Sequence, residues 1–256
     1  MPEKPVLFEK KGPIGIITLN RPEQKNAIFL DMTLELRTLR EGIGWDCEIA
    51  VFLITGKGDH FSIGCDPEVY RSFDQREDLI KNLSLTASIA SLTQPTIAVI
   101  RGDALAQGME LALACDIRLC SDHSHFSLNQ ISRNEIPFDG GTQRLPRLIG
   151  RTKAMEMILT GKKIDATEAK AIGLVNQVVP TAELESTAMK MAEDLAAKGR
   201  VALRYAKEAV MKGLDMTLEQ GLRLEADLYY LLHTTQDRRE GIRAFREKRP
   251  PKFEGK

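Results

Sequence analysis

The stretch Gly102-Asp-Ala-Leu-Ala-Gln-Gly-Met-Glu-Leu-Ala-Leu-Ala-Cys-Asp-Ile117 places one carboxylate, Glu110, at the start of a helix that follows a buried strand. The strand is predicted over Thr96–Ile100, a short apolar run rich in β-branched residues. The helix is predicted to begin near Gln107, because Gly108 permits a tight turn and the following residues favour helix. Unpaired N–H groups at a helix start suit a developing negative charge, so the stretch indicates acid/base chemistry beside an oxyanion site. The alternative is a carboxylate that only complements the helix dipole.

Two further segments carry chemical signals. Residues 49–55 read as a second buried strand, and the loop after it contains Gly64, where glycine allows close approach of another backbone segment. Downstream, the run from Phe126 to Leu145 contains Gln130 and the turn Ile136-Pro-Phe-Asp-Gly-Gly141.

The chain changes character once. Residues 6–19 alternate like a hairpin, Leu30–Ile43 has helical spacing, and strand and helix signals then alternate through Ile149, which predicts an α/β fold with a largely parallel sheet. From Gly150 the strand signals nearly vanish. Asp165 and Thr217 are predicted N-caps among five helical stretches: Thr152–Leu159, Asp165–Ile172, Ala182–Ala197, Val201–Gly213 and Leu218–His233.

Five motifs in order, from Leu19-Asn-Arg-Pro-Glu23 and Asn26-Ala27 to Glu240-Gly-Ile-Arg-Ala-Phe-Arg-Glu-Lys-Arg249, resemble the enoyl-CoA hydratase/isomerase (crotonase) superfamily across nearly the whole chain. The resemblance implies that residues 1–149 form a crotonase spiral of ββα units with the CoA and oxyanion site. It implies that residues 150–256 form a helical region for trimer packing and site closure.

The resemblance also implies an oxyanion hole that holds the thioester carbonyl of an acyl-CoA. Carried over, its two backbone N–H donors are Cys65 and Gln107, although the family usually has Gly where this chain has Ala106 and Gln107. The Cys65 sulfur itself reads as a small buried hydrophobe. Substrate and CoA contacts are expected at six further residues: Ala27, Ile63, Gly64, Asp66, Gly108 and Pro137.

In the hydratases that this chain resembles, two glutamates hold and deprotonate the water. Glu110 matches the first, but Gln130 stands at the second position. Gln exchanges no proton at neutral pH, although its amide can orient water. The alternative is that the Gln130 side chain only fills the space that the second glutamate occupies in those hydratases.

Asp139 is a candidate second ionisable group. The Phe-Asp-Gly-Gly run around it resembles ring-acting members of the superfamily, and its position matches the nucleophilic aspartate of a chlorobenzoyl-CoA dehalogenase. A desolvated pair of Glu110 and Asp139 would have separated pKa values, which lets one act as base and the other as acid. The alternative is a turn residue before two glycines.

Composition and motif content argue against several other classes of protein. The 256 residues carry a formal net charge of zero with 5% aromatic residues, which argues against nucleic-acid binding. There is no apolar leader and no run near the ~18 apolar residues that span a bilayer. The four cysteines form no close framework, so we expect reduced thiols and a cytoplasmic location. No metal-ligand spacing or dinucleotide fingerprint stands out, so we expect no metal and no cofactor, coenzyme A being part of the substrate.

The sequence thus predicts an acyl-CoA hydratase, with Glu110, Gln130 and Asp139 as its reacting groups. The combination at positions 130 and 139 makes a cyclic or dienoyl thioester attractive, for example cyclohexa-1,5-diene-1-carbonyl-CoA. Alternatives within the family are double-bond isomerisation and hydrolytic ring cleavage of a ketone. A more distant one is RNA binding, known for one hydratase relative. We expect a homotrimer or a dimer of trimers.

Overall fold

The main sheet has six strands in the order β1-β2-β3-β4-β6-β9. This computed structural model describes residues 3–44, 46–66, 69, 78 and 82–256. The first two strands form the predicted antiparallel hairpin, and every other neighbouring pair is parallel. The bounds are β1 (Val6–Lys11), β2 (Ile14–Leu19), β3 (Val51–Gly56), β4 (Thr96–Ile100), β6 (Ile117–Ser121) and β9 (Gln177–Val179).

A second, smaller sheet supplies the other strand of each ββα unit. It consists of β5 (Asp103–Leu105), β7 (His125–Ser127) and β8 (Ile164–Asp165) in the order β5-β7-β8. After β4 the chain enters β5 and then helix α5 (Gln107–Ala114), and after β6 it enters β7 and then α6 (Gly141–Ile149). A strand of each sheet followed by a helix is one ββα unit, so the structure contains the ββα units that the resemblance implies.

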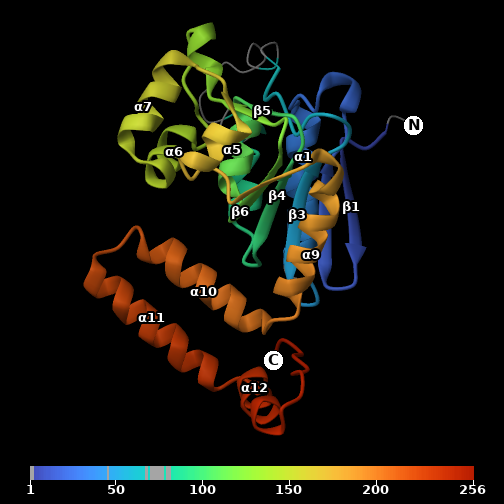
Figure 1. Cartoon of the computed structure of the whole chain (residues 1–256), viewed down its shortest axis with the longest axis vertical. Coiled ribbons are helices and arrows are strands. Elements are labelled where there is room, and N and C mark those ends of the chain that lie inside the picture. Colours follow the sequence, from blue (N-terminus) through green and yellow to red (C-terminus); the bar gives the residue numbers. More distant parts are fainter. Residues whose placement is uncertain (1–2, 45, 67–68, 70–77, 79–81) are drawn as a thin grey trace.

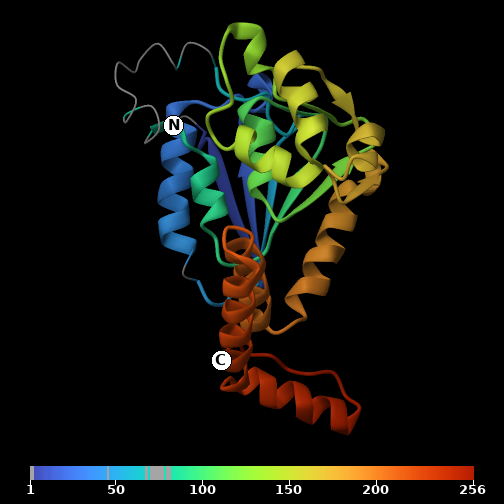
Figure 2. The same ribbon diagram turned by 90° about the vertical axis from the view of Figure 1, so that its left-hand side faces the viewer.

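Helices cover both faces of the main sheet (Figure 1). Along β3 the side chains alternate: Phe52 and Ile54 join one buried cluster with α1 and α5, whereas Val51 and Leu53 join another with α9. Figure 2 shows α1 and α9 on opposite sides of the sheet. The bounds of these and nearby helices are α1 (Leu30–Ile43), α4 (Thr86–Ala90), α7 (Arg151–Thr160), α8 (Ala166–Ala171) and α9 (Leu184–Ala196), with 3-10 turns at Pro22–Gln24, Asn129–Arg133 and Thr181–Glu183.

The C-terminal region differs from the expected all-helical segment that begins at residue 150. Strands β8 and β9 lie in it, and Met157, Leu174 and Leu184 belong to the buried clusters of the body. The body therefore continues through α9, which corrects the boundary expected between residues 149 and 150. The two strands are two and three residues long, too short to show an alternating pattern.

The last three helices leave the body at one end (Figures 1 and 2). They are α10 (Arg200–Gly213), α11 (Leu218–His233) and α12 (Gln236–Glu247), and few of their side chains are buried within the chain. The predicted N-caps are confirmed, because Asp165 accepts from the Glu168 N–H and Thr217 forms a capping box with Gln220. No helix of the described residues is long and apolar enough to cross a membrane.

Candidate active site

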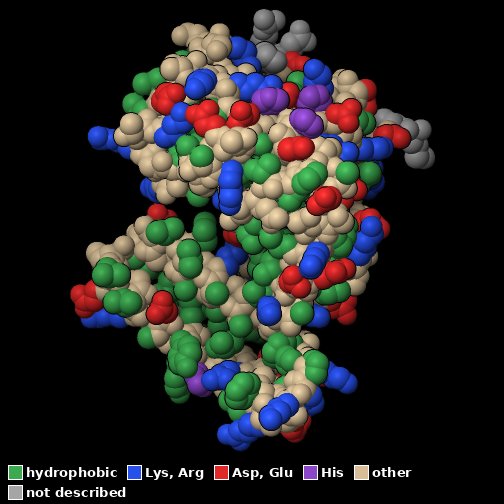
Figure 3. Space-filling view, in the orientation of Figure 1, with side chains coloured by type: hydrophobic (Ala, Val, Ile, Leu, Met, Phe, Trp, Pro, Cys, Tyr) green, Lys and Arg blue, Asp and Glu red, His purple; other side chains and the backbone are tan. Residues whose placement is uncertain are grey.

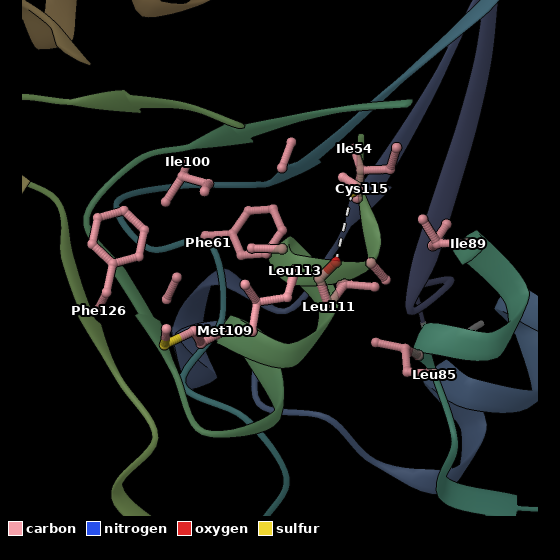
Figure 4. Packing of buried hydrophobic residues seen from close by; sticks show 14 of the residues in the cluster. Ile54, Phe61, Leu85, Ile89, Ile100, Met109, Leu111, Leu113, Cys115 and Phe126 are labelled. Atoms are coloured by element: carbon pink, nitrogen blue, oxygen red, sulfur yellow. Dashed lines mark hydrogen bonds between the residues drawn. The ribbon is translucent and has the colours of Figure 1, made fainter. Parts of the chain in front are cut away.

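The helix that carries Glu110 is completely enclosed. All eight residues of α5 are buried, and it begins at Gln107 as predicted. Figure 4 shows Met109, Leu111 and Leu113 of this helix among other apolar side chains, including Phe61 of the loop after β3 and Phe126 of β7. A helix held on all sides by close packing moves little, so α5 fixes the positions of the groups at its N-terminus.

The loop after β3 lies directly against the start of this helix. The Ser62 N–H donates to the Asp103 carbonyl at 3.1 Å, and the Leu105 N–H donates back to the Ser62 carbonyl at 2.9 Å. At Gly64, where φ is +88°, an added Cβ would lie 2.8 Å from the Gln107 nitrogen. Only glycine allows this approach, which explains why the sequence has Gly at position 64.

The segments that carry the two expected oxyanion donors are brought together by this contact. Cys65 forms a parallel bridge with Ile28 that uses the Gly64 carbonyl and the Asp66 N–H, so the Cys65 N–H takes no part in it. The Gln107 N–H belongs to the first turn of α5, where helix N–H groups have no intrahelical partner. The arrangement suits two amides that bind one carbonyl oxygen.

The turn before Gln107 is strained. Ala106 has φ of +49°, in a region that residues other than glycine seldom adopt, and it precedes the helix without a side-chain cap. Such strain persists only where the surrounding contacts fix the conformation, and it is common at active sites. Gly108 adds one such contact, since a Cβ there would lie 2.4 Å from the Ser62 carbonyl oxygen.

The remaining expected substrate contacts lie on segments around this turn. Ala27 precedes the Ile28 N–H that donates to Gly64, and the Ile63 N–H donates to the Lys25 carbonyl. Asp66 is joined to the same segment through Ile28. Pro137 lies beside Gly141, since a Cβ added at Gly141 would be 2.9 Å from the Pro137 Cβ and 3.0 Å from Glu110 Oε1. The structure thus gathers these residues around α5, and their contacts with a substrate stay predictions.

The Glu110 carboxylate is fully buried, at 0% exposure, and well supplied with donors. Its Oε1 accepts from the Asp139 N–H at 2.9 Å and the Gly141 N–H at 2.8 Å, and its Oε2 accepts from Gln130 Nε2 at 3.0 Å. Its pKa is raised from 4.5 to about 7, mainly by burial and also by the charge of Asp139, while the Gly141 N–H lowers it. A carboxyl group with a pKa near neutrality can both accept and release a proton.

This pKa makes stability depend on pH. The folded-state pKa of about 7 exceeds the ordinary value of 4.5, so the folded state binds the proton more tightly. The resulting stability is present below the lower value and is lost as pH rises through about 7. Relative to Glu110→Gln, we expect the wild-type free energy of unfolding to fall by about 2–3 kcal/mol from pH 5 to 8. Denaturant unfolding of both proteins at equal concentration measures the free energy of unfolding at each pH. The same pH dependence in wild type and Glu110→Gln would contradict the prediction.

Gln130 contacts the reacting group that the sequence predicted. It is buried in the 3-10 turn Asn129–Arg133, and while its Nε2 donates to Glu110, its Oε1 has no hydrogen-bond partner among the described residues. A buried acceptor without a donor is costly unless a ligand or water supplies one. The amide therefore has the free acceptor needed to hold a water beside the Glu110 carboxylate.

Asp139 lies in the site but its carboxylate faces other groups. The Oδ1 atom is 2.7 Å from both Ser84 Oγ and Thr86 Oγ1, and Oδ2 accepts from the N–H groups of Leu85 and Thr86 and from Gln107 Nε2. Only the backbone N–H of Asp139 contacts Glu110. These donors occupy the carboxylate, so the geometry gives no support to a paired acid/base role with Glu110, which stays a prediction.

Several residues of this network were missed by sequence reasoning. Ser84, Leu85 and Thr86 lie more than fifty positions before Asp139, and nothing in their local pattern indicates a contact with it. The Gln107 side chain was also missed, because only its backbone N–H was expected to act. Its Nε2 donates to both the Leu83 carbonyl and Asp139 Oδ2.

Possible metal ligands are not assembled into a site. Within the described ranges, no three His, Cys, Asp or Glu side chains are grouped so that they could hold a metal ion. Of the Cys120–His125 segment, Cys120 is buried and His125 lies 3.4 Å from an Asp103 oxygen. That segment runs from the end of β6 through a turn to the first residue of β7.

Comparison with known proteins gives consistent results. The sequence pattern of the family described as enoyl-CoA hydratase/isomerase matches residues 9–256. The YngF protein of Bacillus subtilis, which carries the enoyl-CoA hydratase/isomerase name, is 40% identical over 98% of both chains. The crotonyl-CoA hydratase of Syntrophomonas wolfei is 34% identical over 97% of both. The crystal structure of enoyl-CoA hydratase from Bacillus anthracis superposes with a TM-score of 0.93 at 38% identity, covering 98% of this chain and 100% of that one.

Proposed function

The chain belongs to the enoyl-CoA hydratase/isomerase family, and we propose that it is a hydro-lyase that adds water across the double bond of an unsaturated acyl-CoA thioester. One observation carries the proposal: the buried Glu110 carboxylate, with a pKa near 7, lies 3.0 Å from the Gln130 amide, whose oxygen is free to accept from water. The start of α5, with the Gln107 N–H, is three residues away along the same helix.

The reaction uses these groups in sequence. Water is held between Gln130 Oε1 and Glu110 Oε2, and Glu110 takes its proton as the oxygen attacks Cβ of the thioester. Electrons move to the thioester oxygen, where the Cys65 and Gln107 N–H groups stabilise the negative charge. The enolate then collapses and Cα takes up the proton from Glu110, since Gln130 carries none. The product is a 3-hydroxyacyl-CoA, and Glu110 returns to its ionised form.

A panel of linear enoyl-CoA thioesters tests the activity. Hydration increases the product mass by one water, isomerisation leaves it unchanged, and ring cleavage of a cyclic ketone gives a dicarboxylic acyl-CoA. A single carboxylate also suffices to move a proton from Cγ to Cα, so isomerisation is the second candidate. Mass spectrometry separates these outcomes, and a panel without any product that contains an added water would refute the hydratase proposal.

The proposal also concerns the identity of the acyl group. We include cyclic and dienoyl thioesters in the panel, with cyclohexa-1,5-diene-1-carbonyl-CoA as the example, because Gln130 and the segment 136–141 resemble ring-acting relatives. No separate cofactor enters this mechanism, since coenzyme A arrives as part of the substrate. Faster turnover of linear than of cyclic thioesters would refute the cyclic assignment alone.

Restoring a second glutamate tests the role of Gln130. We expect Gln130→Glu to raise turnover on a short linear enoyl-CoA, because it recreates the two-carboxylate arrangement of the hydratases. Two carboxylates at about 3 Å cannot both ionise easily, so the acidic limb of the pH–rate profile should move to higher pH. Gln143→Glu on the exposed side of α6 is the control. Lower turnover with an unchanged profile would contradict the prediction.

We also propose that α10–α12 mediate assembly into a homotrimer or a dimer of trimers. Apolar side chains gather over α10 and α11 (Figure 3), and several are highly exposed in the single chain, including Leu218 at 80% and Phe245 of α12 at 85%. Exposed patches of this kind mark association surfaces. Light scattering at micromolar concentration should give at least three times the 28.6 kDa of one chain. A mass of one chain would refute the proposal.

A further inference from the structure

We propose that Asp139 and the Gln107 side chain form one positioning unit, which holds the oxyanion amide and the Glu110 carboxylate in fixed relation during the reaction. The proposal rests on the hydratase function proposed above. It replaces the proton-transfer role expected for Asp139, and it gives a function to a side chain whose backbone alone was expected to act.

Asp139 contacts both halves of the site through different atoms. Its backbone N–H donates to Glu110 Oε1 at 2.9 Å, and its carboxylate Oδ2 accepts from Gln107 Nε2, also at 2.9 Å. It is itself fixed, because its carbonyl accepts from Arg144 Nη1 at 3.0 Å and its carboxylate accepts from the N–H groups of Leu85 and Thr86. A displacement of Asp139 would therefore move the proton-transfer group and the oxyanion donor together.

The Gln107 side chain fixes the first residue of α5. Its Nε2 donates in two directions, to the Leu83 carbonyl at 2.5 Å and to Asp139. The preceding residue, Ala106, has the strained φ of +49°, so the turn needs contacts that oppose relaxation. The two bonds supply them at the residue whose N–H faces the thioester oxygen. A small misplacement of such a donor is costly to the rate.

An amide can replace the Asp139 carboxylate without breaking this unit. In Asp139→Asn, the amide oxygen can take the Oδ2 position and accept from the backbone N–H groups and Gln107. Its NH2 group then faces the hydroxyls of Ser84 and Thr86, which can rotate to accept. Asp139→Ala removes every one of these contacts. The pair of variants thus separates contact geometry from proton transfer.

The experiment compares kcat and KM of four variants with wild type: Asp139→Asn, Asp139→Ala, Gln107→Met and the double variant Asp139→Ala/Gln107→Met. We expect Asp139→Asn to keep kcat within about tenfold, and Asp139→Ala and Gln107→Met each to lose about tenfold or more with little change in KM. The double variant should lose less than the product of the single losses, because both remove one interaction. Gln94→Met is the matched control, since Gln94 is equally buried and contacts the Asp46 carbonyl outside the site.

The pH profile gives a readout that a purely structural role would not move. The charged groups that act on Glu110 are Asp139, which raises its pKa, and Arg144 of α6, which lowers it. Asp139→Asn removes the first, so the acidic limb of Glu110 should shift to lower pH and should not be lost. Loss of the acidic limb, an Asp139→Asn variant as inactive as Asp139→Ala, wild-type kcat in Gln107→Met, or multiplicative losses in the double variant would each overturn the proposal.

Glu110→Gln, assayed alongside, keeps the two proposals distinguishable. If it is inactive while the Gln107 variant is fully active, the hydratase site stands and only the positioning unit fails. If it is active, the proposed function fails. Should Asp139→Ala not fold, because it leaves the buried Leu85 and Thr86 N–H groups unpaired, the Asp139→Asn and Gln107→Met arms still decide.

Discussion

Turnover of Glu110→Gln falls by at least about 10²-fold on the true substrate, because the variant can no longer exchange a proton in the transition state. The Gln side chain has the same shape and keeps an oxygen that accepts from the N–H groups of Asp139 and Gly141. Thioester binding should therefore survive. Steady-state kinetics give the loss of turnover, and calorimetric titration with a saturated acyl-CoA gives the dissociation constant.

The same reasoning fixes the pH dependence and the control. Glu110 must be ionised to take a proton from water, so wild-type kcat/KM should fall as pH drops through about 7. Glu135→Gln is the matched control, because the Glu135 carboxylate pairs with Arg133, while the Glu135 backbone N–H that donates to the Gln130 carbonyl is kept in the variant. Near wild-type turnover in Glu110→Gln would remove Glu110 from the mechanism, and so would an equal loss in the control.

The sequence predicted most closely those parts whose pattern is local. Helices α1, α5 and α11 begin at the predicted residues, and the Thr217 cap is present, because helical periodicity and capping are properties of a few consecutive residues. Strands β8 and β9 were missed because a pattern of period two needs more than two or three residues. Neither helical periodicity nor strand alternation could predict that the body ends at α9, since this boundary depends on packing between distant segments.

The candidate site shows the same division. The family resemblance carried the oxyanion pair to Cys65 and Gln107, and the contact of Gly64 with the Gln107 nitrogen brings these segments together. The direction of the Asp139 carboxylate depends on Ser84 and Thr86, and no sequence pattern links positions so far apart. A residue can thus be placed in a site from its motif, while its chemical role depends on which of its atoms faces the reacting group.

Gly64→Ala should have the second largest effect, a loss of about 10²–10³ in kcat, which is the usual consequence of losing one oxyanion donor. The added methyl would lie 2.8 Å from the Gln107 nitrogen and 2.9 Å from the Leu105 carbonyl oxygen, both of them backbone atoms that cannot turn aside. The loop must move away from α5, and the Cys65 N–H moves with it. Steady-state kinetics on a thioester that the wild-type enzyme hydrates, with thermal unfolding in parallel, measure the effect.

Positive φ alone would also disfavour alanine, so the control must separate strain from contact. Gly173 has φ of +77°, close to the +88° of Gly64, but an added Cβ there meets nothing within 4 Å. Gly173→Ala therefore carries the backbone strain, about 1 kcal/mol, without touching the site, and it should lower stability while kcat stays near wild type. If Gly64→Ala loses stability by the same amount and keeps its turnover, then the approach of Gly64 to Gln107 serves folding only. Loss of turnover in Gly64→Ala alone assigns the contact to the oxyanion site, because both substitutions introduce backbone strain at positive φ and only Gly64 lies against the Gln107 nitrogen.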